Sequence, residues 1–277
     1  MRTAVVGHVE WVEFARVERV PTAGEIAHAL DWWEEPAGGG SVAAVQLQKL
    51  SGDCTFYTAL GKDTVGKRAH LELEALGPRV EAARRSAVTR RAVTFIDPSG
   101  ERTITTLGER LQPNASDPLP WDELAQTDAA YFTAGDLGAL AAARRARVLV
   151  GTSRAIDVLA QADFPLDAIV GSARDPSERY DPRVLKRMPR LAVLTDGANG
   201  GRWVTEDGRR GTFRVAQPSG GVVDTYGVGD SFAAGLAYAL GAGLGVEEAL
   251  ALAARCGAAC VAGRGPYTAQ LTAAELP

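Results

Sequence analysis

The sequence contains little of what metal centres and disulfide frameworks require. Only three cysteines and three histidines occur among its 277 residues, and the histidines are scattered. No Cys-x-x-Cys pair is present. Cys256 and Cys260 are spaced to share one helix face, which is typical of small core residues on an Ala-rich helix. The sequence therefore argues against a zinc site or a disulfide.

Long hydrophobic runs and a strong excess of one charge are also missing. No uninterrupted apolar stretch reaches the roughly 18 residues that a membrane span needs. Residues 1–6 are too short for the apolar core of a signal peptide, and Glu10 and Glu13 follow closely. The net charge of -4 provides no basic surface for nucleic acid or an anionic membrane. We therefore expect a cytoplasmic protein with no nucleic-acid or membrane partner.

The chain does contain an ordinary globular composition, 46% apolar and 23% charged, in which strand and helix patterns alternate. No fixed-period repeat and no linker divides it, so we expect one domain over residues 1–277. Alternating strands and helices predict the α/β class, with a mainly parallel central sheet and helices on both faces. The patterns predict strands at residues 3–9, 54–60, 129–133, 147–150, 167–170 and 191–194, and helices at 38–50, 66–76, 228–240 and 246–261.

Two hairpin patterns interrupt this alternation. Residues 92–96 and 102–106 flank a turn with the sequence Asp-Pro-Ser-Gly, and a second pair of short strands flanks Asp207-Gly208. The first hairpin does not fit a parallel sheet. We therefore expect it to belong to a small accessory β-sheet.

The strongest chemical motif is the segment 224–232, with the sequence DTYGVGDSF, which opens an Ala-rich helix. Its two glycines permit tight backbone turns and the close approach of a ligand. The unpaired N–H groups at the helix start form an anion site that needs no lysine. From the residues alone, Asp230 fits two roles: it either caps the helix or acts chemically on a bound ligand.

Residues 224–230 resemble the DTxGAGD signature of the ribokinase-like sugar kinases, the PfkB carbohydrate kinase family, with Val228 in place of the usual Ala. The resemblance implies that Asp230 is the catalytic base. It also implies that the N–H groups of Gly227, Val228 and Gly229 form an anion hole for the transferring phosphoryl group, in agreement with the demands of phosphoryl transfer. ATP and Mg²⁺ are the implied cofactors, and a monovalent cation stays open as a third.

Other segments resemble the same family in the same order, from about residue 3 to residue 268. The resemblance implies a ribokinase-like three-layer α/β/α fold whose lid comprises residues 13–33 and 89–106. The matching segments are 21–25 (PTAGE, similar to PxxGE), 38–40 (GGG, a substrate-side glycine motif), 59–66 (ALGKDTVG, similar to GxDxxG), 99–103 (SGERT, a lid turn) and 194–201 (LTDGANGG, similar to the T-x-G-x-x-G segment that lines the nucleotide).

These segments assign the candidate binding residues. The resemblance implies a nucleotide site made by Thr195, Gly197, Gly200, Thr225, Gly227 and Gly229. It implies a substrate site made by Glu10, Gly38, Gly39, Gly40 and Asp230.

Three departures from the family pattern concern the substrate and the metal. The acidic residue that binds substrate hydroxyls in many members aligns with Val12, and Glu10 and Glu13 lie beside it. An Asn that holds the sugar aligns with Val42, whose side chain cannot make that hydrogen bond. The N-x-x-E motif aligns with residues 172–175. There Ser172 and Asp175 keep oxygen ligands at the same spacing, and we expect them to serve Mg²⁺.

Two other glycine patterns fit less well. Residues 61–67 match G-x-x-x-x-G-K, but Arg68 stands where a P-loop needs Ser or Thr for Mg²⁺. The pair Gly227-x-Gly229 lacks the third glycine of a dinucleotide-binding fingerprint, because Phe232 occupies that position.

The sequence therefore predicts an ATP-dependent kinase that phosphorylates a hydroxyl group of a sugar or sugar-like small molecule. Two alternatives stay open. One is a nucleoside kinase of the same fold, with the base packed near Val12 and Val42. The other is a non-catalytic ligand sensor that kept the fold. For Trp32 and Trp33, substrate stacking, a lid contact in a homodimer and simple packing all stay open.

Overall fold

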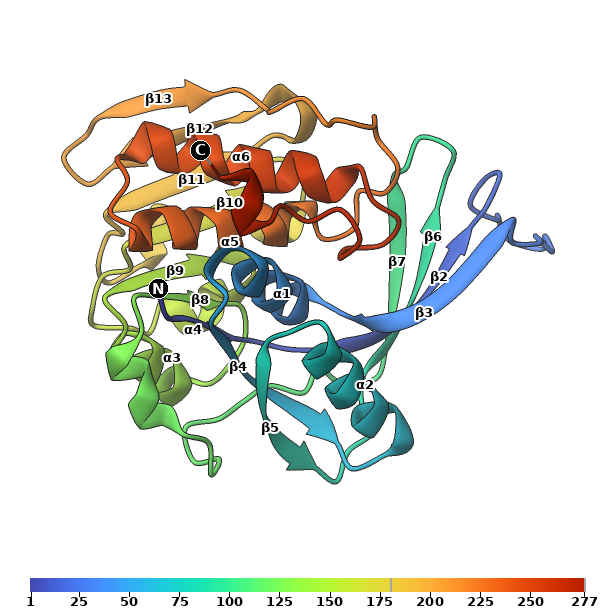
Figure 1. Cartoon of the computed structure of the whole chain (residues 1–277), viewed down its shortest axis with the longest axis horizontal. Coiled ribbons are helices and arrows are strands. Elements are labelled where there is room, and N and C mark those ends of the chain that lie inside the picture. Colours follow the sequence, from blue (N-terminus) through green and yellow to red (C-terminus); the bar gives the residue numbers. More distant parts are fainter. Residues whose placement is uncertain (180, 277) are drawn as a thin grey trace.

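A large central sheet dominates the computed structural model, which describes residues 1–179 and 181–276 (Figure 1). Within these residues its nine strands are β1 (Thr3–Val6), β4 (Cys54–Gly61), β5 (Arg79–Arg85), β8 (Ala129–Phe132), β9 (Val148–Thr152), β10 (Ala168–Ser172), β11 (Leu191–Thr195), β12 (Gly201–Thr205) and β13 (Arg210–Phe213). Their order across the sheet is β13-β12-β11-β10-β9-β8-β1-β4-β5.

Every neighbouring pair from β11 through β5 is parallel, whereas β12, near one edge, pairs antiparallel with both β11 and β13. The inner strands β1 and β8 are buried along their whole length. Such uniformly buried strands are expected where helices cover both faces of a parallel sheet. The prediction of a mainly parallel central sheet is therefore confirmed.

Helices form the outer two layers. The α-helices of the described residues are α1 (Gly39–Ser51), α2 (Thr64–Ala75), α3 (Leu137–Ala143), α4 (Ile156–Leu159), α5 (Val228–Gly241) and α6 (Val246–Val261). Short 3₁₀ helices are η1 (Trp121–Gln126), η2 (Ser153–Ala155), η3 (Pro176–Glu178), η4 (Pro182–Val184), η5 (Gly197–Asn199) and η6 (Ala273–Glu275). None of the helices in residues 1–179 and 181–276 has the length and apolar character needed to cross a membrane.

The two faces of the central sheet carry separate cores. On one face, α1, α5 and α6 contribute Val45, Leu236 and Ala253 to a core that also contains sheet residues such as Val5. On the other face, α3 contributes Leu140 to a second apolar cluster. Two cores on opposite faces of one sheet confirm the three-layer α/β/α architecture.

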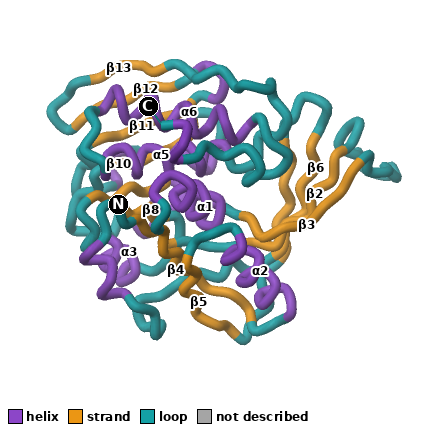
Figure 2. Tube along the Cα trace, in the orientation of Figure 1, coloured by secondary structure: helices purple, strands orange, loops and turns teal. Residues whose placement is uncertain are grey.

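A second, four-stranded sheet projects from one side of the central sheet (Figures 1 and 2). Its strands, in spatial order, are β3 (Asp31–Ala37), β2 (Glu10–Arg16), β6 (Arg91–Ile96) and β7 (Arg102–Leu107). The expected hairpin is present as the antiparallel β6–β7 pair. We call this sheet the lid; it also includes residues 10–12 and 34–37, which lie outside the expected lid segments.

Aromatic packing joins the lid to the body of the protein. The rings of Phe14 and Trp33 stack with centroids 4.9 Å apart, and Tyr226 meets the Phe14 ring edge-on at 5.0 Å. Trp33 is thus part of the packing between lid strands and the segment before α5. Trp32 points outward and leaves 68% of its surface exposed.

Candidate active site

The site lies at the edge of the central sheet where the parallel strands end. The segment His8–Glu10 follows β1, Arg154 follows β9, and Ser172 ends β10. The start of α1 is packed directly over the end of β1, since a Cβ at Gly40 would lie 2.6 Å from the His8 carbonyl oxygen. Carboxyl ends of parallel strands are the usual position of ligand sites in such sheets.

The glycine turn before α5 has the geometry of an anion site. Gly227 has a φ of 77°, in the left-handed region, and α5 begins at the next residue. A Cβ at Gly227 would lie 2.8 Å from Val42 Cγ1, so this turn also requires close packing against α1. A Cβ at Gly229 would meet no atom within 4 Å. The open space beside the first-turn N–H groups leaves room for a phosphate.

Residues just before the turn hold the loop and the lid together. The buried Asp224 carboxylate accepts hydrogen bonds from the Tyr226 N–H at 2.8 Å and the Gly265 N–H at 3.0 Å. The Thr225 N–H donates to the Gly100 carbonyl at 2.9 Å, and its carbonyl accepts from Arg102 Nη1 at 3.0 Å. Thr225, expected at the nucleotide, thus also fixes the lid turn.

Asp230 lies in the first turn of α5, opposite the start of α1. A Cβ at Gly39 would lie 2.7 Å from Asp230 Oδ1, so only glycine fits there without displacing the carboxylate. Although part of Asp230 remains exposed, burial raises its pKa to about 6. The positive charge of Arg154 opposes that rise, and the negative charge of Glu178 adds to it. A carboxylate with this pKa is suited to general-base chemistry near neutral pH.

Glu10 is the second buried carboxylate of the site. A Cβ at Gly38 would lie 3.4 Å from Glu10 Cγ, so the glycine segment borders this side chain. Arg90 Nη1 lies 3.2 Å from Glu10 Oε1, and His8 Nε2 lies 3.9 Å from the same oxygen. Burial, with smaller effects of nearby arginines, lowers the pKa of His8 to about 3, so this imidazole is neutral. Glu13 instead points away and pairs with Arg91.

The structure brings together the predicted substrate residues Glu10, Gly38, Gly39, Gly40 and Asp230, as described. It adds residues that sequence reasoning missed: His8, Arg90, Arg154 and Glu178. Each follows the end of a strand or lies in a connecting loop, without a motif of its own. The carboxyl-end position of His8 and Arg154 was the one signal available, because such positions converge at one edge of the sheet.

The segment expected at the nucleotide forms the turn between β11 and β12. Thr195 ends β11, where its hydroxyl donates to the Gly171 carbonyl at 3.2 Å. Gly197 packs against the Arg174 guanidinium, and Gly200 packs against the backbone of Phe213. Phe213 stacks on Phe232 of α5 with centroids 5.4 Å apart. This stack ties the β12–β13 hairpin to the helix that carries Asp230.

Of the expected metal ligands, Asp175 is already well supplied with hydrogen bonds. Its Oδ1 accepts from the Ser177 N–H at 2.9 Å, and its Oδ2 accepts from Arg154 Nη2 at 2.7 Å. The Ser172 hydroxyl accepts from the Asp175 N–H at 3.4 Å. Across residues 1–179 and 181–276, no cluster of three or more His, Cys, Asp or Glu side chains has the arrangement of a metal site.

Val12 and Val42 are both completely buried in the core cluster. Val42 packs against Gly227, and Val12 lies in the middle of the lid strand β2. Neither side chain presents surface to a ligand. The expected contact of a nucleoside base with these two side chains is therefore not offered by their exposed surface, and the nucleoside alternative stays a prediction.

Comparisons with known proteins place kinases among the relatives of this chain. An ATP-dependent ribose-1-phosphate kinase of Halopiger xanaduensis is 27% identical over 276 residues, covering 93% of this chain and 91% of the relative. An aminoimidazole riboside kinase of Salmonella typhimurium is 25% identical, with 84% of each chain covered.

Solved structures show the same fold. A ribokinase of Giardia lamblia superimposes with a TM-score of 0.80 at 18% identity, covering 99% of this chain and 98% of that one. A ribokinase of Arabidopsis thaliana, solved with ribose and ATP, gives 0.76 at 20% identity, with coverages of 99% and 96%. The family model described as pfkB family carbohydrate kinase matches residues 2–150 and 152–273, so the chain belongs to that family of kinases.

Proposed function

We propose that the chain transfers the γ-phosphoryl group of ATP to a hydroxyl of a sugar or sugar-like small molecule, with Asp230 as the base. The observation that carries this proposal is the position of Asp230. It stands in the first turn of α5, beside the open face of Gly229, and burial raises its pKa to about 6. A base and an anion site therefore share one helix start.

In this reaction the Asp230 carboxylate takes the proton of the acceptor hydroxyl. The acceptor oxygen forms a bond to the γ-phosphorus while the bond from that phosphorus to the β,γ-bridging oxygen breaks, and ADP leaves. The N–H groups of residues 227–230 stabilise the charge on the transferring group, since phosphoryl transfer depends mainly on positioning and electrostatics. Glu10, with Gly38 and Gly39 beside it, binds and orients the acceptor.

Magnesium is the expected companion of ATP. Protein sites commonly hold Mg²⁺ through one or two carboxylates together with substrate phosphates, so a cluster of three protein ligands is not required. Asp175 fits this mode through Oδ2, which accepts one hydrogen bond from Arg154 and keeps a second lone pair, whereas Oδ1 accepts from both the Ser177 N–H and the Ser177 hydroxyl. Mg²⁺ would neutralise phosphate charge there, with Ser172 as a second oxygen donor.

The test compares the parent with Asp230→Asn. The amide keeps the shape of the side chain but cannot accept the hydroxyl proton, so kcat should fall by roughly 10²–10⁴. The Kd for ATP should change much less, because the loop N–H groups remain. The assay measures ADP release over a panel of sugars, sugar acids, polyols and nucleosides, and thermal unfolding checks that the variant is folded.

Two results would contradict the proposal. An Asp230→Asn protein that turns over as fast as the parent would remove Asp230 from the mechanism. A parent that binds ATP and an acceptor but phosphorylates none of the panel would favour a ligand sensor. Preferential turnover of nucleosides would identify a nucleoside kinase instead. The relatives include both a kinase named for ribose 1-phosphate and a kinase named for a riboside.

A further inference from the structure

Strand β3 connects the outer edge of the lid to the proposed acceptor site. Its last residue, Ala37, pairs with Glu10 of β2 and is followed directly by Gly38. The Gly38 N–H donates to the Tyr226 hydroxyl at 3.1 Å, which ties this end of the strand to the segment before α5. The position of β3 therefore helps to set the positions of Glu10 and of the glycine segment.

Glu35, a partly buried acid of β3, lies against the turn that follows α6. A Cβ at Gly265 would overlap Glu35 Oε1, so the carboxyl group is in contact with the backbone of that turn. The same oxygen accepts a hydrogen bond from Trp33 Nε1 at 2.9 Å. The buried Asp224 carboxylate accepts from the Gly265 N–H at 3.0 Å. An acid of the lid and an acid of the body thus meet at one glycine.

No basic side chain neutralises Glu35. Within residues 1–179 and 181–276, no lysine or arginine forms an ion pair with it; Arg264 of the adjacent turn pairs instead with Asp31 at 3.0 Å. The Arg264 guanidinium also stacks on Trp33, 3.9 Å from the centroid of the ring. The turn therefore grips β3 on both sides of Glu35 and leaves the carboxyl group without a counter-charge in direct contact.

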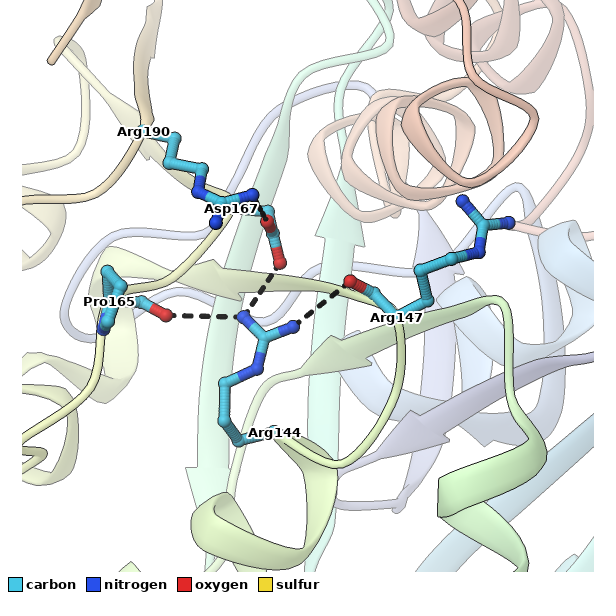
Figure 3. Close-up of a pocket in the computed structure, with 5 residues that line it drawn as sticks. All are labelled: Arg144, Arg147, Pro165, Asp167 and Arg190. Carbon is cyan, nitrogen blue, oxygen red and sulfur yellow. Dashed lines mark hydrogen bonds and ion pairs between the residues drawn. The ribbon is translucent and has the colours of Figure 1, made fainter.

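Asp167, at the edge of the central sheet where β10 begins, provides the contrast. It pairs with Arg144 at 2.7 Å and with Arg190 at 3.1 Å (Figure 3). Two guanidinium groups hold that carboxylate in its ionised form. Glu35 has an indole N–H as its one side-chain hydrogen-bond donor in the described structure.

The charged groups around Glu35 act in both directions. Burial raises the pKa of Glu35 from 4.5 to about 7. The hydrogen bond from Trp33 opposes this rise, and the negative charge of Asp224 adds to it. The charge of Arg264 lowers the pKa, and that of Glu72, on α2, raises it. A change of protonation near neutral pH therefore occurs in the contact between lid and body.

Other contacts hold the lid without changing charge in this range. The Tyr267 hydroxyl donates to the Pro36 carbonyl at 2.6 Å, and burial raises its pKa well above the ordinary value, so it stays neutral. At the base of the lid, Asp63 accepts hydrogen bonds from the Thr89 N–H at 2.9 Å and from its hydroxyl at 2.7 Å. Burial raises the pKa of Asp224 as well, but two backbone hydrogen bonds oppose the rise.

We infer that Glu35 is a positioning residue that holds β3 on the body of the protein, and that it holds the strand more tightly when protonated than when ionised. A protonated Glu35 still accepts from Trp33 and no longer repels Asp224. When the lid lifts away, the carboxyl group returns to water and its pKa falls back toward 4.5. Docking of the lid is therefore strongest below about pH 4.5 and weakens as the pH rises through about 7. Its effect on the acceptor rests on the proposed function.

Hydrogen exchange of two neighbouring amides tests this latch without any ligand. The Thr225 N–H donates to the Gly100 carbonyl of the lid at 2.9 Å, so it exchanges when the lid lifts away. The Val223 N–H donates to the Val261 carbonyl of the body at 2.9 Å and is the internal control. NMR measures both rates in the parent and in Glu35→Gln at the same pH, so the intrinsic chemical rate cancels. Exchange detects openings that are too rare to change the average structure.

Glu35→Gln keeps an acceptor for Trp33 but cannot ionise, so it mimics the protonated form at every pH. The ratio of the Thr225 exchange rate in the parent to that in Glu35→Gln should rise at least about tenfold from about pH 5.5 to about pH 8. The Val223 ratio should stay constant. Glu13→Gln is the matched control, because Glu13 lies on the neighbouring strand but pairs with Arg91 at 2.6 Å, and it should follow the parent.

A kinetic comparison connects the latch to the acceptor. Glu35→Ala removes the acceptor for Trp33, so KM for the acceptor should rise at least about fivefold, the order of one hydrogen bond, and more than kcat falls. Glu35→Gln should restore the KM of the parent. Should Glu35→Ala fail to fold, the exchange of the parent and Glu35→Gln decides the inference alone.

The outcomes separate the latch from the kinase. The same pH dependence of Thr225 exchange in the parent and in Glu35→Gln would overturn the latch and assign the dependence to another group, such as Asp224. A Val223 amide that follows Thr225 would also overturn it, because the opening would not be confined to the lid. An unchanged KM in a folded Glu35→Ala protein would overturn the positioning role. Absence of turnover with every acceptor would overturn the proposed kinase, while the exchange rates would still decide the latch.

Discussion

Replacing Arg154 by Gln and Glu178 by Gln should move the acidic limb of the pH–rate profile in opposite directions. Burial raises the pKa of Asp230, the charge of Arg154 lowers it, and the charge of Glu178 raises it. Removing the guanidinium therefore raises the pKa further, and the limb moves to higher pH. Removing the Glu178 charge also frees Arg154 from its ion pair, so the limb moves to lower pH.

The size of these shifts follows from the charges involved. A base with a pKa of about 6 is about 90% ionised at pH 7 and about 10% ionised at pH 5, so kcat/KM of the parent should fall about tenfold between them. A change of about 1.4 kcal/mol in the electrostatic free energy of the carboxylate moves its pKa by about one unit. Solvent screens the half-exposed Arg154, so we expect each limb to move by about 0.5–1 pH unit.

The assay records initial rates from about pH 4.5 to about pH 8.5 with one acceptor and saturating ATP and Mg²⁺. Phosphate groups of ATP titrate in the same range, so the comparison is between variants measured with identical substrates. Glu206→Gln, in the exposed turn between β12 and β13, is the control. Limbs that move in the same direction, or that coincide in all proteins, would show that a group other than Asp230 governs the profile.

Three further substitutions test the geometry of the site. Gly229→Val should leave the fold intact, because a Cβ there meets no atom within 4 Å, but it should raise the Kd for ATP at least about tenfold. Calorimetry measures this Kd, and Gly245→Ala at the start of α6 is the control. Gly39→Ala should lower kcat more than it changes the Kd for ATP, because the added Cβ would lie 2.7 Å from Asp230 Oδ1 and would push the carboxylate away. An unchanged kcat in a folded variant would contradict this contact. Asp63→Ala should destabilise the protein by about 1–2 kcal/mol, because it removes the N-cap of α2 and the anchor of the lid; a denaturant midpoint equal to that of the parent would contradict this.

The sequence was sufficient for most of the central sheet, because most of its strands are short apolar runs that can be recognised without their partners. The edge strand β5, with the charged sequence RVEAARR, was not predicted. The sequence was less informative for the lid. Strand β2 carries Glu10 and Glu13 between apolar residues, and strand β3 has the sequence DWWEEPA, which contains a proline. β2 pairs with both β3 and β6, and β3 pairs with β2, over long sequence separations that stabilise both strands. Such pairing leaves little trace in a local pattern.

The same distinction holds at the site. The glycine turn and Asp230 were found because they form one continuous motif whose geometry follows from local backbone chemistry. Arg90 and Arg154 come from separate segments, and only folding brings Arg90 to Glu10 and places Arg154 where its charge acts on Asp230. In the sequence each is one of many arginines. The sequence also suggested that Val42 faces the substrate, whereas it packs against Gly227 in the core.

The ion pairs of Arg154 support the role that we propose for Asp230 as a base. Burial raises the pKa of Asp230 and so favours its protonated form, which could not accept a proton. A direct salt bridge to an arginine would lower its pKa and occupy its oxygens. Arg154 avoids this, because its guanidinium is held by Glu178 at 2.6 Å and Asp175 at 2.7 Å, and it makes no ion pair with Asp230 in the described structure. Its charge therefore opposes the effect of burial on the pKa without an ion pair to Asp230, and the Asp230 oxygens stay available to the hydroxyl of the proposed acceptor.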